Sequence, residues 1–341
     1  MERLSLPRGV RTPMTISFIL SSLFFFLQGC GSFIQNTAID TTAGLMYKGT
    51  DEIIGEKNWE MFRDGTPGNL KMLEGLAYLR PENEELLVSL TKGLAGLAFV
   101  VDETLYLEEQ MTESEKTPNK NQAIMHYSKA MDYGLSYLKL KGISYSDLQA
   151  RVIEDNGIFN LLEKNLSSKM IDLEAVIFTA QSLGSLINLQ RANMTLVAQL
   201  PIAKAMFDWV CAKSPDINFG ACGIFYGAYE SGRPRALGGN PKKGQKIFLE
   251  TIEKYPENTL VRVSYIQYYL IPQGEIDLYQ AQKVKLEEAG ELFKKEMSWT
   301  PAIQLKKENA KGNHHEGGFC IYKALGLKRF EIIKKYEKKL F

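Results

Sequence analysis

The chain is poor in the residues with which most enzymes do chemistry. Its 341 residues include three histidines and four cysteines, and neither a G-x-S-x-G nucleophile motif nor an H-E-x-x-H metal motif occurs. The run Asn313–Glu316 contains two adjacent histidines, but neighbouring side chains point in different directions on a helix, which favours a solvated loop over a metal site. We therefore predict that the protein is not an enzyme and holds no metal or cofactor.

The chain also lacks a charge bias and any clear alternation of apolar and polar residues. Its formal net charge is +1, which gives no electrostatic case for binding nucleic acid. Without alternation no β-strand is predicted. No segment after the first thirty residues reads as a membrane-spanning helix. These absences predict an all-α body that does not bind nucleic acid.

What is present begins with an export signal. Three arginines precede the uncharged run Met14 to Leu27, which falls short of the about twenty residues that cross a bilayer. A basic start and a short apolar core are typical of a signal peptide. The next residues, "LQGC", resemble the bacterial lipobox, in which cleavage precedes the cysteine and the thiol carries diacylglycerol. An ordinary signal peptide with an incidental cysteine, or an uncleaved anchor, are the alternatives.

We therefore predict a lipoprotein signal peptide over residues 1–29, lipidation of Cys30 and a lipidated tether over residues 30–45. Gly31 follows the cysteine where Asp would favour retention in the inner membrane, so we expect the periplasmic face of the outer membrane. Cleavage would remove three arginines and one glutamate, which moves the formal charge from +1 to −1.

Three cysteines remain after lipidation, and an odd number does not indicate a disulfide framework. Cys211 and Cys222 could pair across a helix–loop–helix, but buried thiols are the expected state of these two and of Cys320.

Residues 46–341 have helical periodicity. The stretch "ELLVSLTKGLAGLAFVVDETLY" places aliphatic residues at helical spacing. The stretches that begin at Asn121, Asp172 and Tyr279 also place apolar residues at helical spacing. In the first stretch Gly93 and Gly96 are small enough to let another helix approach closely. The tripeptide Pro-Glu-Asn follows an amphipathic segment twice, in "RPENEELLVSL" and in "YPENTLVRVSY", and each time we predict that it begins a new helix.

Small and aromatic residues precede several of the prolines at the spacing that closes a tetratricopeptide repeat. The pattern is clearest before Pro215 and looser before Pro256 and Pro81; Ala123, Tyr127 and Ala130 match it without a proline. We therefore predict degenerate tetratricopeptide-like helix hairpins, stacked as an α-solenoid over residues 46–341. A generic helical bundle is the alternative.

Together these features resemble the TatT component family of TRAP transporters, which are tetratricopeptide-type periplasmic lipoproteins. The resemblance is carried by the lipobox and by residues Gly68–Glu103, Asp172–Leu189 and Ala236–Leu270, and the chain departs from the pattern after Lys306. It implies an all-helical superhelix, a homotrimer, and docking of a periplasmic TRAP-type solute-binding protein. It also implies hydrophobic or organic-acid ligands. The motifs are structural and locate no site.

An aromatic run suggests where a ligand or partner would bind. Tyrosines of this run recur at helical spacing, which usually indicates core packing, although a tyrosine can also line a passage for an amphipathic molecule. The candidate binding residues are Tyr226, Tyr229, Tyr265, Tyr268 and Tyr269. The first hypothesis is a lipid-anchored accessory subunit that assists a TRAP-type solute receptor in uptake of a small molecule. The alternative is a lipoprotein adaptor in outer-membrane or cell-wall assembly.

Overall fold

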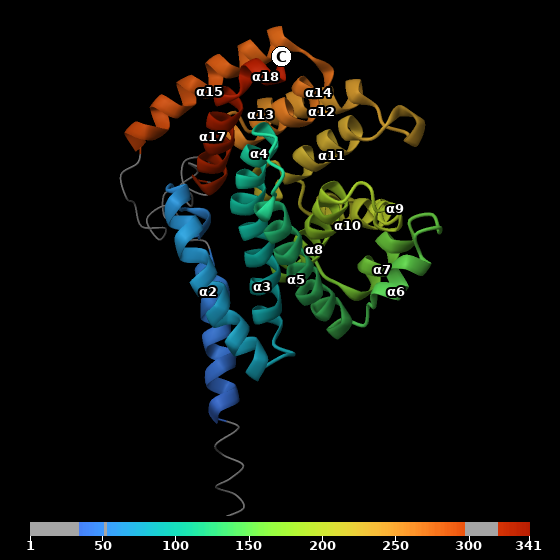
Figure 1. Cartoon of the computed structure of the whole chain (residues 1–341). Coiled ribbons are helices and arrows are strands. Elements are labelled where there is room, and N and C mark those ends of the chain that lie inside the picture. Colours follow the sequence, from blue (N-terminus) through green and yellow to red (C-terminus); the bar gives the residue numbers. More distant parts are fainter. Residues whose placement is uncertain (1–33, 51–52, 297–319) are drawn as a thin grey trace, which may run out of the picture.

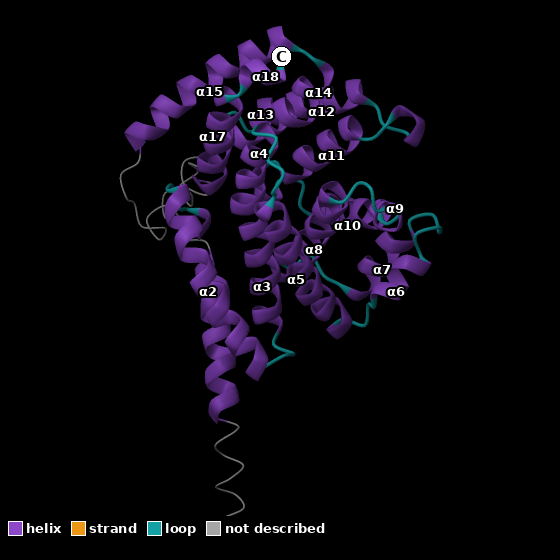
Figure 2. Ribbon diagram, in the orientation of Figure 1, coloured by secondary structure: helices purple, strands orange, loops and turns teal. Residues whose placement is uncertain are grey.

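The computed structural model describes residues 34–50, 53–296 and 320–341, and every regular element in these ranges is helical (Figure 2). The first half contains a helix over residues 34–50, then α2 (Trp59–Leu79), α3 (Glu84–Leu97), the π-helix η1 (Ala98–Asp102), α4 (Glu103–Met111), α5 (Pro118–Leu140), α6 (Tyr145–Ala150), α7 (Gly157–Asn165) and α8 (Met170–Leu189). The second half contains α9 (Met194–Val197), α10 (Leu200–Lys213), η2 (Ile217–Phe219), α11 (Ala221–Gly232), η3 (Arg235–Leu237), α12 (Pro241–Lys254), α13 (Thr259–Tyr265), the π-helix η4 (Ile266–Leu270), α14 (Ile271–Gln273), α15 (Ile276–Glu296), α17 (Cys320–Lys335) and α18 (Glu337–Leu340).

The described part of the segment predicted as a tether, residues 34–45, lies in a helix that continues to residue 50. Residues 34–50 are helical, and Ile39 and Ala43 are buried in the main core. Asp40 accepts hydrogen bonds from Arg80 at 2.8 and 3.0 Å and from Asn83 at 2.9 Å. These contacts attach the helix to the body of the protein, and the lipidated tether over residues 30–45 stays a prediction, since Cys30 lies outside the described residues.

Both Pro-Glu-Asn tripeptides begin a helix, as predicted. Asn83 accepts a hydrogen bond from the backbone N–H of Leu86 at the start of α3, and Asn258 accepts one from Leu260 at the start of α13. These side chains satisfy backbone donors that the first turn of a helix leaves unpaired. The helices that precede them, α2 and α12, run back along α3 and α13, so each tripeptide closes a helix hairpin (Figure 1).

The centre of the molecule is a layer formed by α3, α5 and α8 (Figure 1). α5 approaches its neighbours closely at Gly134, where an added Cβ would lie 1.9 Å from the Thr179 hydroxyl and 3.1 Å from Thr91. By length and composition α8 could cross a membrane, although no spanning segment is predicted there from the sequence. However, 72% of its most apolar stretch is buried inside the protein, as in the core helix of a soluble domain.

A disulfide joins α10 to α11. Cys211 and Cys222 are bonded to each other, with their Cα atoms 6.0 Å apart, while Cys320 is buried in α17. The expectation of buried thiols was therefore wrong for the first two cysteines. The expectation rested on the odd number of cysteines, but an odd number also allows one disulfide with the third cysteine left buried.

A second core lies at the other end of the chain. The buried residues of α12, α13, η4, α15 and α17 pack together there, and Gly326 lets α17 approach α13 closely. α17 lies between α2 and α4 in Figure 1 and also contacts both, so the C-terminal helix joins the two ends of the molecule.

Candidate functional site: an apolar cavity between helices

A cavity of about 1200 Å³ lies between the N-terminal helices and the rest of the molecule. Its walls come from the 34–50 helix, α2, α3, η1, α8, α11, η4 and α17, and most of the lining side chains are aliphatic or aromatic. Ligand pockets of proteins are typically about 300–1,000 Å³. The cavity is therefore large enough for a small organic molecule of considerable length.

Glycines widen the cavity. A Cβ added at Gly65, Gly96, Gly184 or Gly232 would meet no atom within 4 Å, and all four residues line the cavity. A glycine inside a helix lowers stability by roughly 0.5–1 kcal/mol relative to alanine. At these four positions the missing side chain leaves open space in the cavity. The prediction that the glycines of α3 admit another helix holds for Gly93, where a Cβ would lie 2.5 Å from Leu70 of α2, and is wrong for Gly96.

Two π-helices contribute to the wall. Phe99 and Val100 come from η1, and Tyr268 comes from η4. In η1 two carbonyl groups accept side-chain hydrogen bonds from distant helices. The indole N–H of Trp59 in α2 donates to the Val100 carbonyl at 2.8 Å, and the guanidinium of Arg329 in α17 donates to the Phe99 carbonyl. Single-turn π-helices are frequent at functional sites, and this one is held by both ends of the chain.

Buried ionisable groups surround η1. Arg329 lies 3.6 Å from Glu103 and donates to Thr104 at 3.0 Å, while Tyr127 donates to Glu103 at 2.6 Å. Burial raises the pKa of Glu103 above its ordinary value, and the nearby Arg329 charge opposes this rise. Burial likewise raises the pKa of Asp102, which lies 2.6 Å from His126. This cluster fixes the position of the π-helix and does not line the cavity.

The charged side chains that line the cavity are mainly basic. Lys92, Arg191 and Arg233 line it, against one acidic residue, Glu56, among the described residues. Arg191 donates to the neutral amide oxygen of Asn188, and no acidic partner of Arg191 occurs in the described part of the chain. Arg191 is therefore the basic residue of the wall at which an anionic group of a bound molecule would meet an unneutralised charge.

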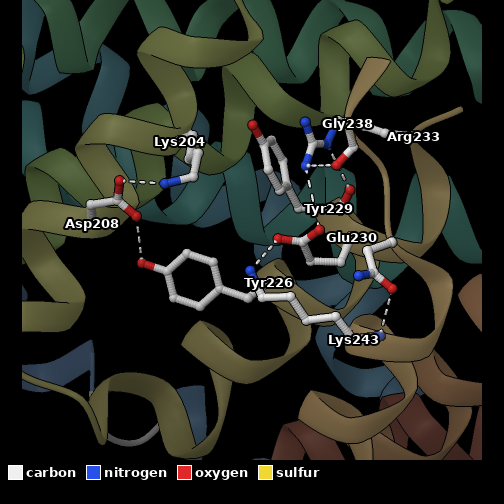
Figure 3. A network of polar contacts seen from close by, with 9 residues as sticks. Lys204, Asp208, Tyr226, Tyr229, Glu230, Arg233, Gly238 and Lys243 are labelled. Atoms are coloured by element: carbon white, nitrogen blue, oxygen red, sulfur yellow. Dashed lines mark hydrogen bonds and ion pairs between the residues drawn. The ribbon is translucent and has the colours of Figure 1, made fainter. Parts of the chain in front are cut away.

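Around α10 and α11 a polar network holds one of these cations (Figure 3). The Arg233 guanidinium lies 3.7 Å from the centre of the Tyr229 ring and donates to the Gly238 carbonyl at 3.1 Å. Its acidic neighbour Glu230, at 3.5 Å, also accepts from Lys243 at 2.8 Å, so two cations share one carboxylate.

Lys92 forms the other charged position, in the middle of α3. Its ammonium lies 2.6 Å from Glu174 of α8 and 3.3 Å from the Thr50 hydroxyl, and Tyr47 donates to the same carboxylate at 2.8 Å. Both ionic side chains are largely buried, so the pair places one neutralised charge at the cavity wall.

The five tyrosines of the aromatic run occupy three different environments. Tyr229 and Tyr268 line the cavity. Tyr226 lies on the same helix as Tyr229 but donates to Asp208 at 2.8 Å in the network of Figure 3. Tyr265 and Tyr269 are buried in the second core, where their rings stack and both hydroxyls bond to Gln245. Two of the five tyrosines therefore line the cavity, two pack in the second core and one belongs to the polar network.

Comparison with known families identifies the chain. The model of the family "TRAP transporter T-component" matches residues 55–292, more than half of the chain. The chain belongs to the TRAP transporter T-component family. Comparison with curated proteins found none that matches. A T-component is an accessory of a TRAP transporter and acts on the periplasmic side, and its family is not a known enzyme family. α17, which supplies part of the cavity wall, lies outside the matched residues.

Most of the residues that shape this site are not among those predicted from the sequence. Gly184 and Lys92 lie inside strongly apolar helices, and each was a usable signal, since a glycine or a charge in a buried helix needs a reason. Among the described residues no group of three or more metal-ligating side chains occurs, and Asn313–Glu316 lie outside them.

Proposed function

We propose that this T-component binds a hydrophobic or amphipathic organic anion in the cavity and delivers it to, or receives it from, a periplasmic TRAP-type solute-binding protein. The observation that carries the proposal is the large apolar cavity of about 1200 Å³ with basic residues in its wall. Apolar lining removes the body of a ligand from water at about 25 cal/mol per Å² of buried apolar surface. No residue of the cavity has to do chemistry for this function.

The charges of the wall favour an anionic head on the ligand. Arg191 has a neutral partner, and Arg233 shares its carboxylate with Lys243. The Arg191 guanidinium, which donates to the neutral Asn188 amide, can take a carboxylate in the bidentate geometry that suits arginine. An organic acid with a long apolar body therefore fits this cavity better than a sugar or an amine.

We also propose that the protein is tethered by acyl chains on Cys30 to the periplasmic face of the outer membrane. The "LQGC" motif supports lipidation, and Gly31 supports the outer membrane. A disulfide between Cys211 and Cys222 suits an oxidising compartment such as the periplasm. Mass spectrometry of the membrane-extracted protein should find diacylglycerol and an acyl group on Cys30, and an unmodified N-terminal segment would contradict the proposal.

The helix hairpins support a degenerate tetratricopeptide repeat as the architecture of the docking surface. The predicted small and aromatic positions are buried in α5, α10 and α12, where such repeats place them: Ala123, Tyr127, Ala130, Ala203, Phe207, Val210, Gly244, Phe248 and Thr251. We propose that these repeats stack as a solenoid, that the protein forms a homotrimer and that the receptor docks on it. Native mass spectrometry of the protein alone and with its receptor measures both assemblies.

Filling the cavity tests the function. Gly184→Phe places a ring into the open space, and Gly75→Phe adds the same ring to an exposed position of α2 outside the cavity. Both replace a helical glycine, so neither should lower helix stability. We expect Gly184→Phe to abolish binding of N-phenyl-1-naphthylamine, a fluorescent apolar probe, and its displacement by long-chain carboxylates, while Gly75→Phe retains both. Unaltered binding in Gly184→Phe would place the ligand elsewhere.

Capture from envelope extracts tests the partner. A TRAP-type solute-binding protein among the retained proteins supports the proposal, whereas capture of barrel-assembly or cell-wall proteins alone would instead favour an adaptor in envelope assembly.

A further inference from the structure

Exposed apolar side chains gather at the end of the molecule where the described chain begins. Ile34, the first described residue, is 65% exposed. Tyr78 and Leu79, in the last turn of α2, are 86% and 51% exposed, and Leu140, the last residue of α5, is 40% exposed. None of these four side chains belongs to either core. The described structure therefore leaves one aromatic and three aliphatic side chains in water at this end.

Two polar contacts bring the four residues to the same end of the molecule. Asp40, early in the N-terminal helix, accepts from Arg80, the residue that follows α2. Lys141, the residue that follows Leu140, donates to Glu84, the first residue of α3, at 2.6 Å. The turn between α2 and α3 therefore lies between the start of the N-terminal helix and the end of α5, at the lower end of the molecule in Figure 1.

This end is also the one nearest to the proposed lipid anchor. Cys30 precedes Ile34 by four residues, and four residue steps span at most about 14 Å. Acyl chains on Cys30 lie in the membrane, so the N-terminal helix begins within that distance of the lipid. α15 lies at the opposite end of the molecule in Figure 1. The position of the anchor therefore indicates a lipid surface as the partner of the exposed apolar residues.

We propose that Ile34, Tyr78, Leu79 and Leu140 form a membrane-contacting patch, which enters the interfacial layer of the bilayer beside the acyl chains. This inference rests on the proposed acylation of Cys30 and goes beyond it. Tyrosine favours the membrane–water interface, where its ring meets lipid and its hydroxyl stays wet. An anchor on Cys30 alone leaves the body free to turn about one point, whereas a patch on three helices fixes how it stands. α15 then lies farthest from the membrane.

The charges at this end predict that the contact depends little on salt. Arg80 pairs with Asp40, and Lys141 pairs with Glu84. These pairs leave little net charge to attract acidic lipids, an attraction that salt would screen. The removal of apolar side chains from water does not need such an attraction.

Fluorescence quenching in the lipidated mature protein tests the patch. Tyr78→Cys and Leu292→Cys, at exposed positions of α2 and α15, each supply one accessible thiol for an NBD fluorophore. Cys211 and Cys222 are bonded to each other and Cys320 is buried. The vesicles consist of phosphatidylethanolamine and phosphatidylglycerol, with a fraction of lipids that carry a nitroxide quencher on the acyl chain. We expect quenching at least about threefold stronger at position 78 than at position 292, at low and at high ionic strength.

Serine substitutions separate insertion from mere closeness to the anchor. In the labelled Tyr78→Cys protein, Leu79→Ser/Leu140→Ser should lower quenching about twofold, because it removes apolar side chains of the patch. Val284→Ser/Leu292→Ser, which replaces two exposed apolar residues of α15, should leave quenching unchanged. The anchor is the same in both variants, so closeness alone predicts equal quenching. Equal quenching in the two variants would overturn the patch.

The remaining outcomes distinguish the patch from its alternatives. If a second copy of the chain covers these residues, NBD fluorescence at position 78 rises with protein density and resists the lipid quencher, which overturns the membrane contact. Water-like fluorescence at position 78 in the acylated protein overturns the patch and leaves the anchor intact. If mass spectrometry finds Cys30 unmodified, the proposed anchor itself fails, and the patch with it.

Discussion

Replacing the buried Arg329 with methionine should lower the free energy of unfolding more than replacing any of the α17 lysines that form ion pairs at the surface. The guanidinium is 2% exposed and lies 3.6 Å from Glu103, which is itself buried. Arg329→Met leaves a buried carboxylate without its cation and the Phe99 carbonyl without its donor. Breaking one side of a buried pair costs about 3–5 kcal/mol, because the other charge stays buried. We expect a loss of that size in the free energy of unfolding.

Urea denaturation followed by far-UV circular dichroism measures the loss, and the same helix supplies the control. Lys335 also pairs with α4, through Glu108 at 2.8 Å, but both side chains are exposed. Lys335→Met should change the midpoint little, since water and salt screen an exposed pair. The double variant Arg329→Met/Glu103→Gln should recover at least about 1 kcal/mol relative to Arg329→Met, because it removes the stranded charge.

The pH dependence has a defined sign. The folded-state pKa of Glu103 is raised by burial, and removing Arg329 takes away the attraction that opposes this rise. A carboxyl group with a raised folded pKa favours folding at low pH, where it is neutral, and loses that contribution as the pH rises through the folded pKa. The loss of unfolding free energy caused by Arg329→Met should therefore be largest at neutral pH. It should become smaller as the pH is lowered toward 4.5, the ordinary pKa of a glutamate. The reasoning would be refuted if Arg329→Met lowered the free energy of unfolding no more than Lys335→Met does. It would also be refuted if the loss were the same at neutral pH and near pH 4.5.

Three further predictions concern elements around the cavity, and urea denaturation measures each. Serine at both Cys211 and Cys222 should lower the free energy of unfolding by about 3 kcal/mol, the chain-entropy value for a short loop, and reductant should have no further effect on that variant. Trp59→Phe leaves the Val100 carbonyl in η1 without its donor and should cost about 1–3 kcal/mol. Asn258→Ala removes the cap of α13 and should cost about 0.5–2 kcal/mol; an unchanged midpoint in any of these variants would count against the assigned contact.

The helices and their starts could be predicted from the sequence because the signals are local. Asn83 and Asn258 lie within three residues of the backbone groups that they cap, so a short stretch of sequence contains the whole interaction. The apolar spacing of α3 and α8 likewise follows from one turn to the next. The docking of residues 34–45 was missed because it depends on two buried side chains and on an ion pair to Arg80, which lies forty residues away.

The cavity could not be predicted, because the same residue type has opposite uses. Gly93 and Gly96 lie one turn apart in α3, and the first admits Leu70 of α2 while the second opens onto empty space. From the sequence alone, a glycine in a helix is compatible both with close packing against another helix and with an open cavity beside it. Its use depends on the distance to the next helix, which long-range packing sets. The ion-pair partner of Lys92 could not be predicted for the same reason, since Glu174 is more than eighty residues away in sequence.

The two π-helices occupy equivalent places in two helix hairpins, and each supplies residues to the cavity wall. Each occurs within a helix begun by Pro-Glu-Asn, η1 after α3 and η4 after α13. In the helix that contains η4, Tyr265, Tyr269 and Leu270 pack in the second core, while Tyr268 lies at the cavity wall. One helix thereby serves a packed hairpin and an open wall, and the hydrogen bonds from Trp59 and Arg329 to η1 stabilise one of these turns.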